Sequence, residues 1–83
     1  MTITLYTTDY CGYCRAAKRL LAERGLAFTE IDVTNNAAER AAVSARADGW
    51  RTVPMVFIDE RFIGGYQELL ALDQAGQLLP GRG

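Results

Sequence analysis

Residues 3–33 run ITLYTTDYCGYCRAAKRLLAERGLAFTEIDV and change their pattern twice. The first five, Ile3–Thr7, are mostly β-branched or aromatic and predict a strand. From Cys14 onward the apolar residues return at helical spacing, at Ala17, Leu20 and Leu21. Gly25 predicts the end of that helix, because glycine accepts the left-handed backbone of a helix terminus.

The segment Ala27–Val33 predicts a second strand, with Ile31 and Val33 on one face. Strand, helix and strand thus follow one another within the first 33 residues. This is the pattern of a βαβ unit, in which the two strands are parallel and the crossover is right-handed. We therefore expect a fold of the α/β class.

A second helix is predicted over Ala37–Ala47, because Asn36 followed by Glu39 resembles a capping box. Asp48–Gly49 is expected to end it. Its expected inner face consists of small residues, namely Ala38, Ala41, Ala42 and Ala45. Such a face would let the helix lie close to the sheet.

The remaining segment predicts two more strands and a third helix. The strands are Val53–Ile58 and Phe62–Ile63, the turn between them is Asp59–Arg61, and the helix is Tyr66–Ala75. Pro54 must lie at the very start of its strand, because proline cannot donate a ladder hydrogen bond. Leu78 and Leu79 are expected to pack back on the core, before a polar tail that begins at Pro80.

The predicted order is β-α-β-α-β-β-α, in a single domain that spans residues 1–83. A four-stranded mixed sheet with helices on both faces satisfies this order.

Composition indicates an ordinary soluble protein. The 83 residues are 49% apolar, and the formal net charge is −1. We expect neither nucleic-acid binding nor a membrane-surface role, because both favour an excess of basic residues.

Residues 1–10 lack the basic start and apolar run of a signal peptide. No stretch approaches the roughly 20 apolar residues of a membrane span. We expect a cytoplasmic protein, in which a stable structural disulfide would be unusual.

The two cysteines of the chain, Cys11 and Cys14, lie where a strand gives way to a helix. Cys11 would face the free N–H groups and positive end of the helix, which favour a thiolate. Cys14 would lie one turn further on, close enough to attack a disulfide formed on Cys11. We therefore predict a redox pair, with Cys11 as nucleophile and Cys14 as resolving thiol. Two inert buried thiols or chance spacing are the alternatives, and a zinc site would lack ligands because the chain has no histidine.

Other residues are expected near the pair. A cis Val53–Pro54 bond would leave the Val53 backbone able to bind an extended peptide or glutathione, although the proline could serve only as a turn device. The pair Gly64–Gly65 would bare N–H groups for a carboxylate at a helix start, or form only a turn. Tyr13 would line the groove or join the core. The weaker candidates Arg40, Arg51 and Trp50 also fit charged helix faces and an amphipathic anchor.

Three motifs in this order, Cys11–Cys14, Thr52–Pro54 and Gly64–Gly65, resemble those of a dithiol glutaredoxin of the thioredoxin superfamily. The resemblance runs from Ile3 to about Leu79 and is nearest to the bacterial type, here with a Cys-Gly-Tyr-Cys centre. It implies a thioredoxin-like fold. It also implies glutathione-dependent reduction of protein disulfides and of protein–glutathione mixed disulfides.

The resemblance also implies which residues bind glutathione. The groove residues carried over by position are Cys11, Tyr13, Thr52, Val53, Pro54, Gly65, Tyr66 and Gln67. Val53 would pair with the cysteinyl backbone of glutathione. The N–H groups around Gly65–Gln67 would hold its γ-glutamyl carboxylate.

The chain departs from the family pattern at two places. Thr8 stands where a lysine is common, three residues before the first cysteine. Tyr66-Gln67-Glu68 stands where a serine or cysteine and acidic residues usually follow the two glycines. Arg40 or Arg51 could replace the missing cation at the glutathione carboxylate.

Two alternatives stay open. Gly49-Trp50-Arg51 resembles the glutaredoxin-like redoxins that take electrons from thioredoxin reductase. Gly12, in place of the usual proline, would permit a [2Fe–2S] cluster bridging two chains, held by Cys11 and glutathione from each. Otherwise no metal is expected. The expected partners are glutathione and disulfide-containing client proteins, and the expected state is a monomer.

Overall fold

The order of strands and helices predicted from the sequence is confirmed in the computed structural model, which describes residues 1–78. The strands in this part of the chain are β1 (Ile3–Thr7), β2 (Thr29–Asp32), β3 (Met55–Ile58) and β4 (Arg61–Gly64). The helices are α1 (Gly12–Glu23), α2 (Ala37–Arg46) and α3 (Tyr66–Gln74). No helix within residues 1–78 has both the length and the apolar character needed to cross a membrane.

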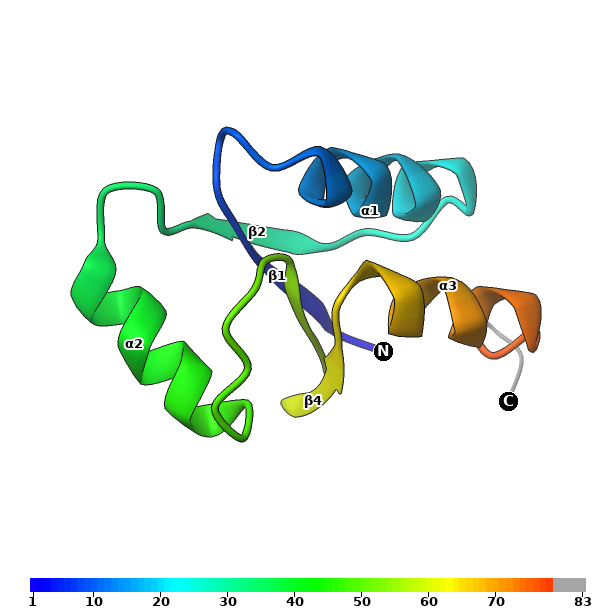
Figure 1. The fold of residues 1–83 in the computed structure, drawn as a ribbon. Helices are drawn as coiled ribbons and strands as arrows, with labels where there is room; N and C mark the ends of the chain where they lie inside the picture. Colours follow the sequence, from blue (N-terminus) through cyan, green and yellow to red (C-terminus); the bar gives the residue numbers. More distant parts are fainter. Residues whose placement is uncertain (79–83) are drawn as a thin grey trace.

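The sheet is mixed, as predicted, with the strand order β2-β1-β3-β4 (Figure 1). Strand β1 pairs in parallel with β2, which confirms the βαβ unit. On its other side β1 runs antiparallel to β3, and β3 runs antiparallel to β4. β1 is thus an inner strand of the sheet, and the loop to α1 begins at its C-terminal end.

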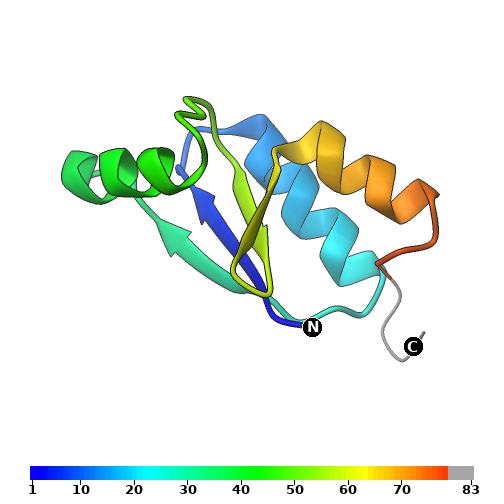
Figure 2. The same ribbon diagram turned by 90° about the horizontal axis from the view of Figure 1, so that it is seen from below.

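Helices cover both faces of the sheet: α1 and α3 lie on one face and α2 on the other (Figure 2). The period-2 alternation of the strands supplies a core to each side. Towards α1 and α3, the buried core residues are Ile3, Leu5, Ala17, Leu20, Leu21, Leu26, Val56, Leu69 and Leu78. Towards α2, they are Tyr6, Val33, Val43, Ala47, Met55 and Phe57.

The inner face of α2 differs from the prediction. The four alanines predicted to face the sheet, Ala38, Ala41, Ala42 and Ala45, are all exposed. The buried residues are Val43 and Ala47, which pack with the aromatic rings of Tyr6 and Phe57. Both sets repeat at helical spacing, but turning Val43 inward removes more apolar surface from water than turning an alanine inward.

Several boundaries also shift from the predicted ones. Strand β2 begins at Thr29 rather than Ala27, because its first partner on β1 is Thr4. Strand β3 begins at Met55, so Pro54 precedes it instead of opening it. Leu78 is buried as predicted, whereas Leu79 and the tail from Pro80 lie outside the described residues.

Candidate active site

Cys11 occupies the N-cap position of α1. Its backbone is extended, and its Sγ accepts a hydrogen bond from the Cys14 backbone N–H at 3.1 Å. The sulfur therefore faces the unpaired N–H groups and the positive end of the helix dipole, as the sequence predicted. Cys11 is half-buried, and its Sγ contacts the backbone of Val53, a residue that lines the groove described below.

Cys14 is fully buried one turn further along α1. Burial raises the pKa of the Cys14 thiol to about 12, and the hydrogen bond and charge of Cys11 act in the same direction. A hydrogen bond with the Thr8 backbone and the charge of Lys18 lower this pKa, but they do not offset the burial. Cys14 is thus held as a neutral thiol, and Cys11 is the sulfur that an external disulfide can reach.

The segment before β3 lies directly beside Cys11. The Val53–Pro54 peptide bond is cis, as predicted. The Cys11 thiol donates to the Val53 carbonyl oxygen, with 3.4 Å between Sγ and oxygen. The Val53 carbonyl, which the sequence predicted to be available to a peptide or glutathione backbone, is therefore already paired in this structure. A Cys11 thiolate has no proton to donate, so ionisation would free the Val53 carbonyl for another donor.

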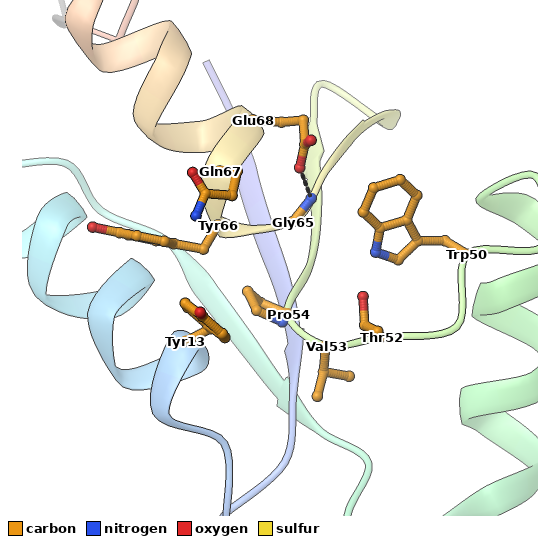
Figure 3. Close-up of a pocket in the computed structure, with 9 residues that line it drawn as sticks. All are labelled: Tyr13, Trp50, Thr52, Val53, Pro54, Gly65, Tyr66, Gln67 and Glu68. Atoms are coloured by element: carbon orange, nitrogen blue, oxygen red, sulfur yellow. Dashed lines mark hydrogen bonds between the residues drawn. The ribbon is translucent and has the colours of Figure 1, made fainter.

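A groove of about 290 Å³ extends from Val53 to the start of α3 (Figure 3). Its lining residues are Tyr13, Trp50, Thr52, Val53, Pro54, Gly65, Tyr66, Gln67 and Glu68. Every groove residue predicted from the sequence other than Cys11 is in this set, and Cys11 adjoins it through Val53. The rings of Tyr13 and Tyr66 stack with their centroids 6.0 Å apart at one side of the groove.

One backbone N–H group at the start of α3 is paired with a side chain of the same helix. Glu68 Oε1 accepts the Gly65 N–H at 2.8 Å, the dashed contact in Figure 3. Gly64 has a φ of 125°, and a Cβ there would lie 2.5 Å from Glu68 Cγ, so the folded-back Glu68 requires this glycine. The Gly65 N–H is therefore not available to a substrate carboxylate, which corrects that part of the prediction. The backbone N–H groups of Tyr66 and Gln67 belong to the first turn of α3, where N–H groups have no partner within the helix.

Trp50 is a groove residue that the sequence left undecided. Its ring packs edge-on against Phe62 with centroids 5.3 Å apart, and its backbone carbonyl accepts from Ser44 Oγ at 2.6 Å. Its indole Nε1 is buried and has no hydrogen-bond partner within residues 1–78. Trp50 lies in a loop without periodicity, so no local pattern indicated its position. Glu68, also missed, could have been found from its capping-box spacing to Gly65.

The two candidate arginines lie outside this groove. Arg40 donates to Tyr10 Oη at 3.4 Å and to the Arg51 carbonyl at 3.1 Å. Both arginines line a second cavity, to whose lining Trp50 also contributes. A third cation, the Arg15 guanidinium, lies 3.7 Å from where a Cβ on Gly12 would stand, and the sequence analysis did not single it out.

At the position where the family commonly has lysine, the hydroxyl of Thr8 is buried with no hydrogen-bond partner in the described chain. Within residues 1–78, no three side chains of the metal-binding types His, Cys, Asp and Glu come together in a way that could hold a metal ion.

Comparison with known proteins agrees with this geometry. A family model described as Glutaredoxin matches residues 3–63, which include both cysteines and the strands around them. The chain belongs to the glutaredoxin family. Glutaredoxin 3 of Escherichia coli K12 is 44% identical over 78 residues, which cover 94% of this chain and 93% of the relative. A probable glutaredoxin of Synechocystis is 41% identical over 94% of this chain and 89% of its own length.

Solved structures extend the similarity to three dimensions. A buckwheat glutaredoxin–glutathione complex superposes with a TM-score of 0.86 at 32% identity, covering 94% of this chain and 73% of that one. A Brucella melitensis glutaredoxin gives a TM-score of 0.81 at 38% identity, covering 94% and 84%. The fold is thus the thioredoxin-like fold of glutaredoxins, and the protein is a thiol–disulfide oxidoreductase of that family.

Proposed function

We propose that this glutaredoxin uses glutathione to reduce protein disulfides and protein–glutathione mixed disulfides in the cytoplasm, with Cys11 as nucleophile. The main support is the position of Cys11 Sγ, at the α1 N-terminus and 3.4 Å from the Val53 carbonyl that borders the groove. Further support is the glutathione complex of the similar buckwheat glutaredoxin. The groove offers the Val53 backbone at one end and the first N–H groups of α3 at the other.

With a mixed disulfide, the Cys11 thiolate attacks the glutathione sulfur. The bond between glutathione and the client breaks, a bond between Cys11 and glutathione forms, and the client leaves as a thiolate that takes up a proton. A second glutathione thiolate then attacks the bound glutathione sulfur. This step releases oxidised glutathione and restores the Cys11 thiolate.

With a client disulfide, Cys11 attacks one client sulfur and the other leaves as a thiolate. Cys14 gives up its proton and attacks Cys11 Sγ, which releases the reduced client and leaves a Cys11–Cys14 disulfide. Two glutathione molecules reduce this disulfide and become oxidised glutathione. Because burial raises the pKa of Cys14 to about 12, the proton must pass to a base such as the departing client thiolate.

The test is NADPH oxidation with glutathione, glutathione reductase and a small glutathione mixed disulfide. We expect turnover in the wild type, its loss in Cys11→Ser and its retention in Cys14→Ser. Turnover that survives Cys11→Ser would contradict the assignment of the nucleophile. No turnover with glutathione, together with turnover coupled to thioredoxin reductase, would favour the redoxin alternative.

The [2Fe–2S] alternative stays a prediction. Cys11 is the sulfur accessible to a second chain, whereas Cys14 is buried, so one cysteine from each chain would bind the cluster. Anaerobic reconstitution with iron, sulfide and glutathione tests it. A colourless monomer after reconstitution would contradict it.

A further inference from the structure

Lys18 lies one helical turn beyond Cys14 on α1. Residues four apart on a helix are neighbours on its surface, so the two side chains lie on the same side of α1. Cys14 is fully buried, whereas 35% of the Lys18 side chain is exposed. The charge of Lys18 acts on the Cys14 thiol and lowers its pKa. A cation thus accompanies the buried sulfur.

Glu30 on the edge strand β2 holds the Lys18 ammonium group. Its Oε2 atom accepts hydrogen bonds from Lys18 Nζ at 2.9 Å and from the buried Thr7 hydroxyl at 2.7 Å. The Thr7 contact fixes the carboxylate against the end of β1, and the carboxylate in turn orients the ammonium group. Asp32, also on β2, is a second carboxylate on which the charge of Lys18 acts. The positive charge near Cys14 is therefore shared with negative charges on β2.

Negative charge forms on the Cys14 sulfur in both directions of the dithiol reaction. When a client is joined to Cys11, Cys14 gives its proton to a base and its thiolate attacks Cys11 Sγ. The bond between Cys11 and Cys14 forms, the bond to the client breaks, and the client leaves as a thiolate. In the reverse direction, an external thiolate attacks Cys11 Sγ and Cys14 leaves as the thiolate.

This charge forms where water does not reach it. Cys14 is fully buried, so the energy of its thiolate depends on nearby protein groups. Cys11 carries no charge while it is joined to a client. Within residues 1–78, Lys18 is then the remaining charged group that shifts the pKa of Cys14. Lys18 is thus in place at the step in which Cys14 must carry charge.

We propose that Lys18 is a positioning residue for the dithiol reaction: its ammonium group attracts the negative charge on Cys14, and Glu30 limits this attraction. The inference rests on the proposed function, because it uses the role of Cys14 as resolving thiol. Removal of Lys18 should slow the step, whereas removal of the Glu30 charge should accelerate it. The equilibrium between dithiol and disulfide should not change, because Cys14 is uncharged in both states at pH 7.

The experiment follows the attack of Cys14 on Cys11 without glutathione. Reduced protein is mixed at pH 7 with an excess of hydroxyethyl disulfide, and samples are quenched in acid and analysed by mass spectrometry. The mixed disulfide on Cys11 forms first, and its decay to the Cys11–Cys14 disulfide does not depend on the reagent concentration. The rate constant of this decay measures the Cys14 step alone.

We expect the decay to slow about twofold to fivefold in Lys18→Met, the range for one partly exposed charge interaction. In Glu30→Gln the decay should become about twofold faster, because the ammonium group is no longer neutralised. The double variant should decay as slowly as Lys18→Met, and Lys18→Arg, which keeps the charge, should match the wild type. Formation of the mixed disulfide on Cys11 should keep its rate in every variant.

Two matched variants control for the loss of a charge. Arg19→Met removes an exposed cation from the same helix, Glu23→Gln removes an exposed carboxylate, and neither should change the decay. The equilibrium constant between dithiol and disulfide is measured in a dithiothreitol buffer. It should stay within about twofold of the wild type in Lys18→Met and in Glu30→Gln, whereas a distortion of the site would change it.

Rates that change in the same direction in Lys18→Met and Glu30→Gln would overturn the proposal. An unchanged rate in Lys18→Met, or an equal effect of Arg19→Met, would do the same. A failure of the proposed function looks different. It would appear as absent turnover of a small mixed disulfide with glutathione, whereas no glutathione takes part in the decay that is measured here.

Discussion

Cys11 and Cys14 are the same side chain in two different surroundings. Cys11 caps α1 and is half-buried, whereas Cys14, one turn further along the helix, is fully buried. Burial in an apolar environment disfavours the thiolate, and this is the main reason that the pKa of Cys14 rises to about 12. The difference in reactivity therefore follows from position in one helical turn.

Alkylation of single-cysteine variants tests this difference. In Cys11→Ser, the remaining Cys14 should react with iodoacetamide at pH 8 about a hundredfold more slowly than a free thiol, because little thiolate is present. In Cys14→Ser, the remaining Cys11 should react readily. The rates are measured by mass spectrometry between pH 6 and pH 10. Comparable rates in the two variants would show that burial does not control reactivity here.

Glu68 places a negative charge at the α3 N-terminus, where the proposed function puts the γ-glutamyl carboxylate of glutathione. Glu68→Gln keeps an oxygen for the Gly65 N–H and removes the charge. We expect the KM for glutathione to fall about twofold to fivefold, because one like-charge repulsion between exposed groups is lost. Glu60→Gln, exposed and outside the groove, is the control. A KM that rises in Glu68→Gln would mean that this carboxylate assists binding.

Between elements, α1 is linked to the edge strand β2 by a small polar network. Glu30 on β2 accepts from Thr7 Oγ1 at 2.7 Å and from Lys18 Nζ at 2.9 Å. The hydrogen bond from Thr7 is the largest cause of a lowered pKa for Glu30, followed by that from Lys18. Because the folded pKa is lowered, the stabilisation is present above the ordinary glutamate value of 4.5 and is lost as pH falls through the folded value.

Glu30→Gln should therefore lower the free energy of unfolding at pH 7 by ~0.2–1 kcal/mol, the range for partly exposed pairs. The gap between the wild type and the variant should close as the pH falls to about 3. Urea unfolding at a series of pH values measures it. Glu23→Gln, exposed in the last turn of α1, controls for the loss of one negative charge. A gap that is constant with pH would exclude the ionised Glu30 as the source.

The rotation of α2 shows where prediction from local pattern ends. Its bounds followed from Asn36, which caps the helix by accepting the Glu39 N–H, and from the stop near Gly49. The buried face of α2 could not be predicted in this way, because Ala41 and Val43 belong to two different faces of the helix whose residues repeat at similar spacing. Only the rings of Tyr6 and Phe57 on the sheet select the stripe that contains Val43.

Across the whole molecule, the sequence predicted the order of the elements, the βαβ unit and nearly all of the groove. These depend on periodicity, turn residues and motifs, which are local in the chain. The sequence left Trp50 undecided, because the place of this residue in the groove depends on the fold of a loop without periodicity. Glu68 was missed although its hydrogen-bond partner Gly65 lies only three residues away. No local pattern indicated that Arg40 and Arg51, which belong to separate segments, line one cavity.

Cys14 also couples the chemistry of the site to the stability of the whole chain. Its folded pKa of about 12 lies above the ordinary value of 9.0, so the stability linked to the neutral thiol is fully present below pH 9.0 and is lost as pH rises towards 12.

Cys14→Ala should lower the free energy of unfolding by ~1 kcal/mol at pH 7.5 through lost packing. The difference in urea midpoint between wild type and variant should then narrow by pH 10.5, because only the wild type has this thiol to ionise on unfolding. Cys11→Ala, at a half-buried position, is the control, and both are measured anaerobically with a reductant. Wild-type and Cys14→Ala midpoints that stay equally far apart at both pH values would contradict the coupling.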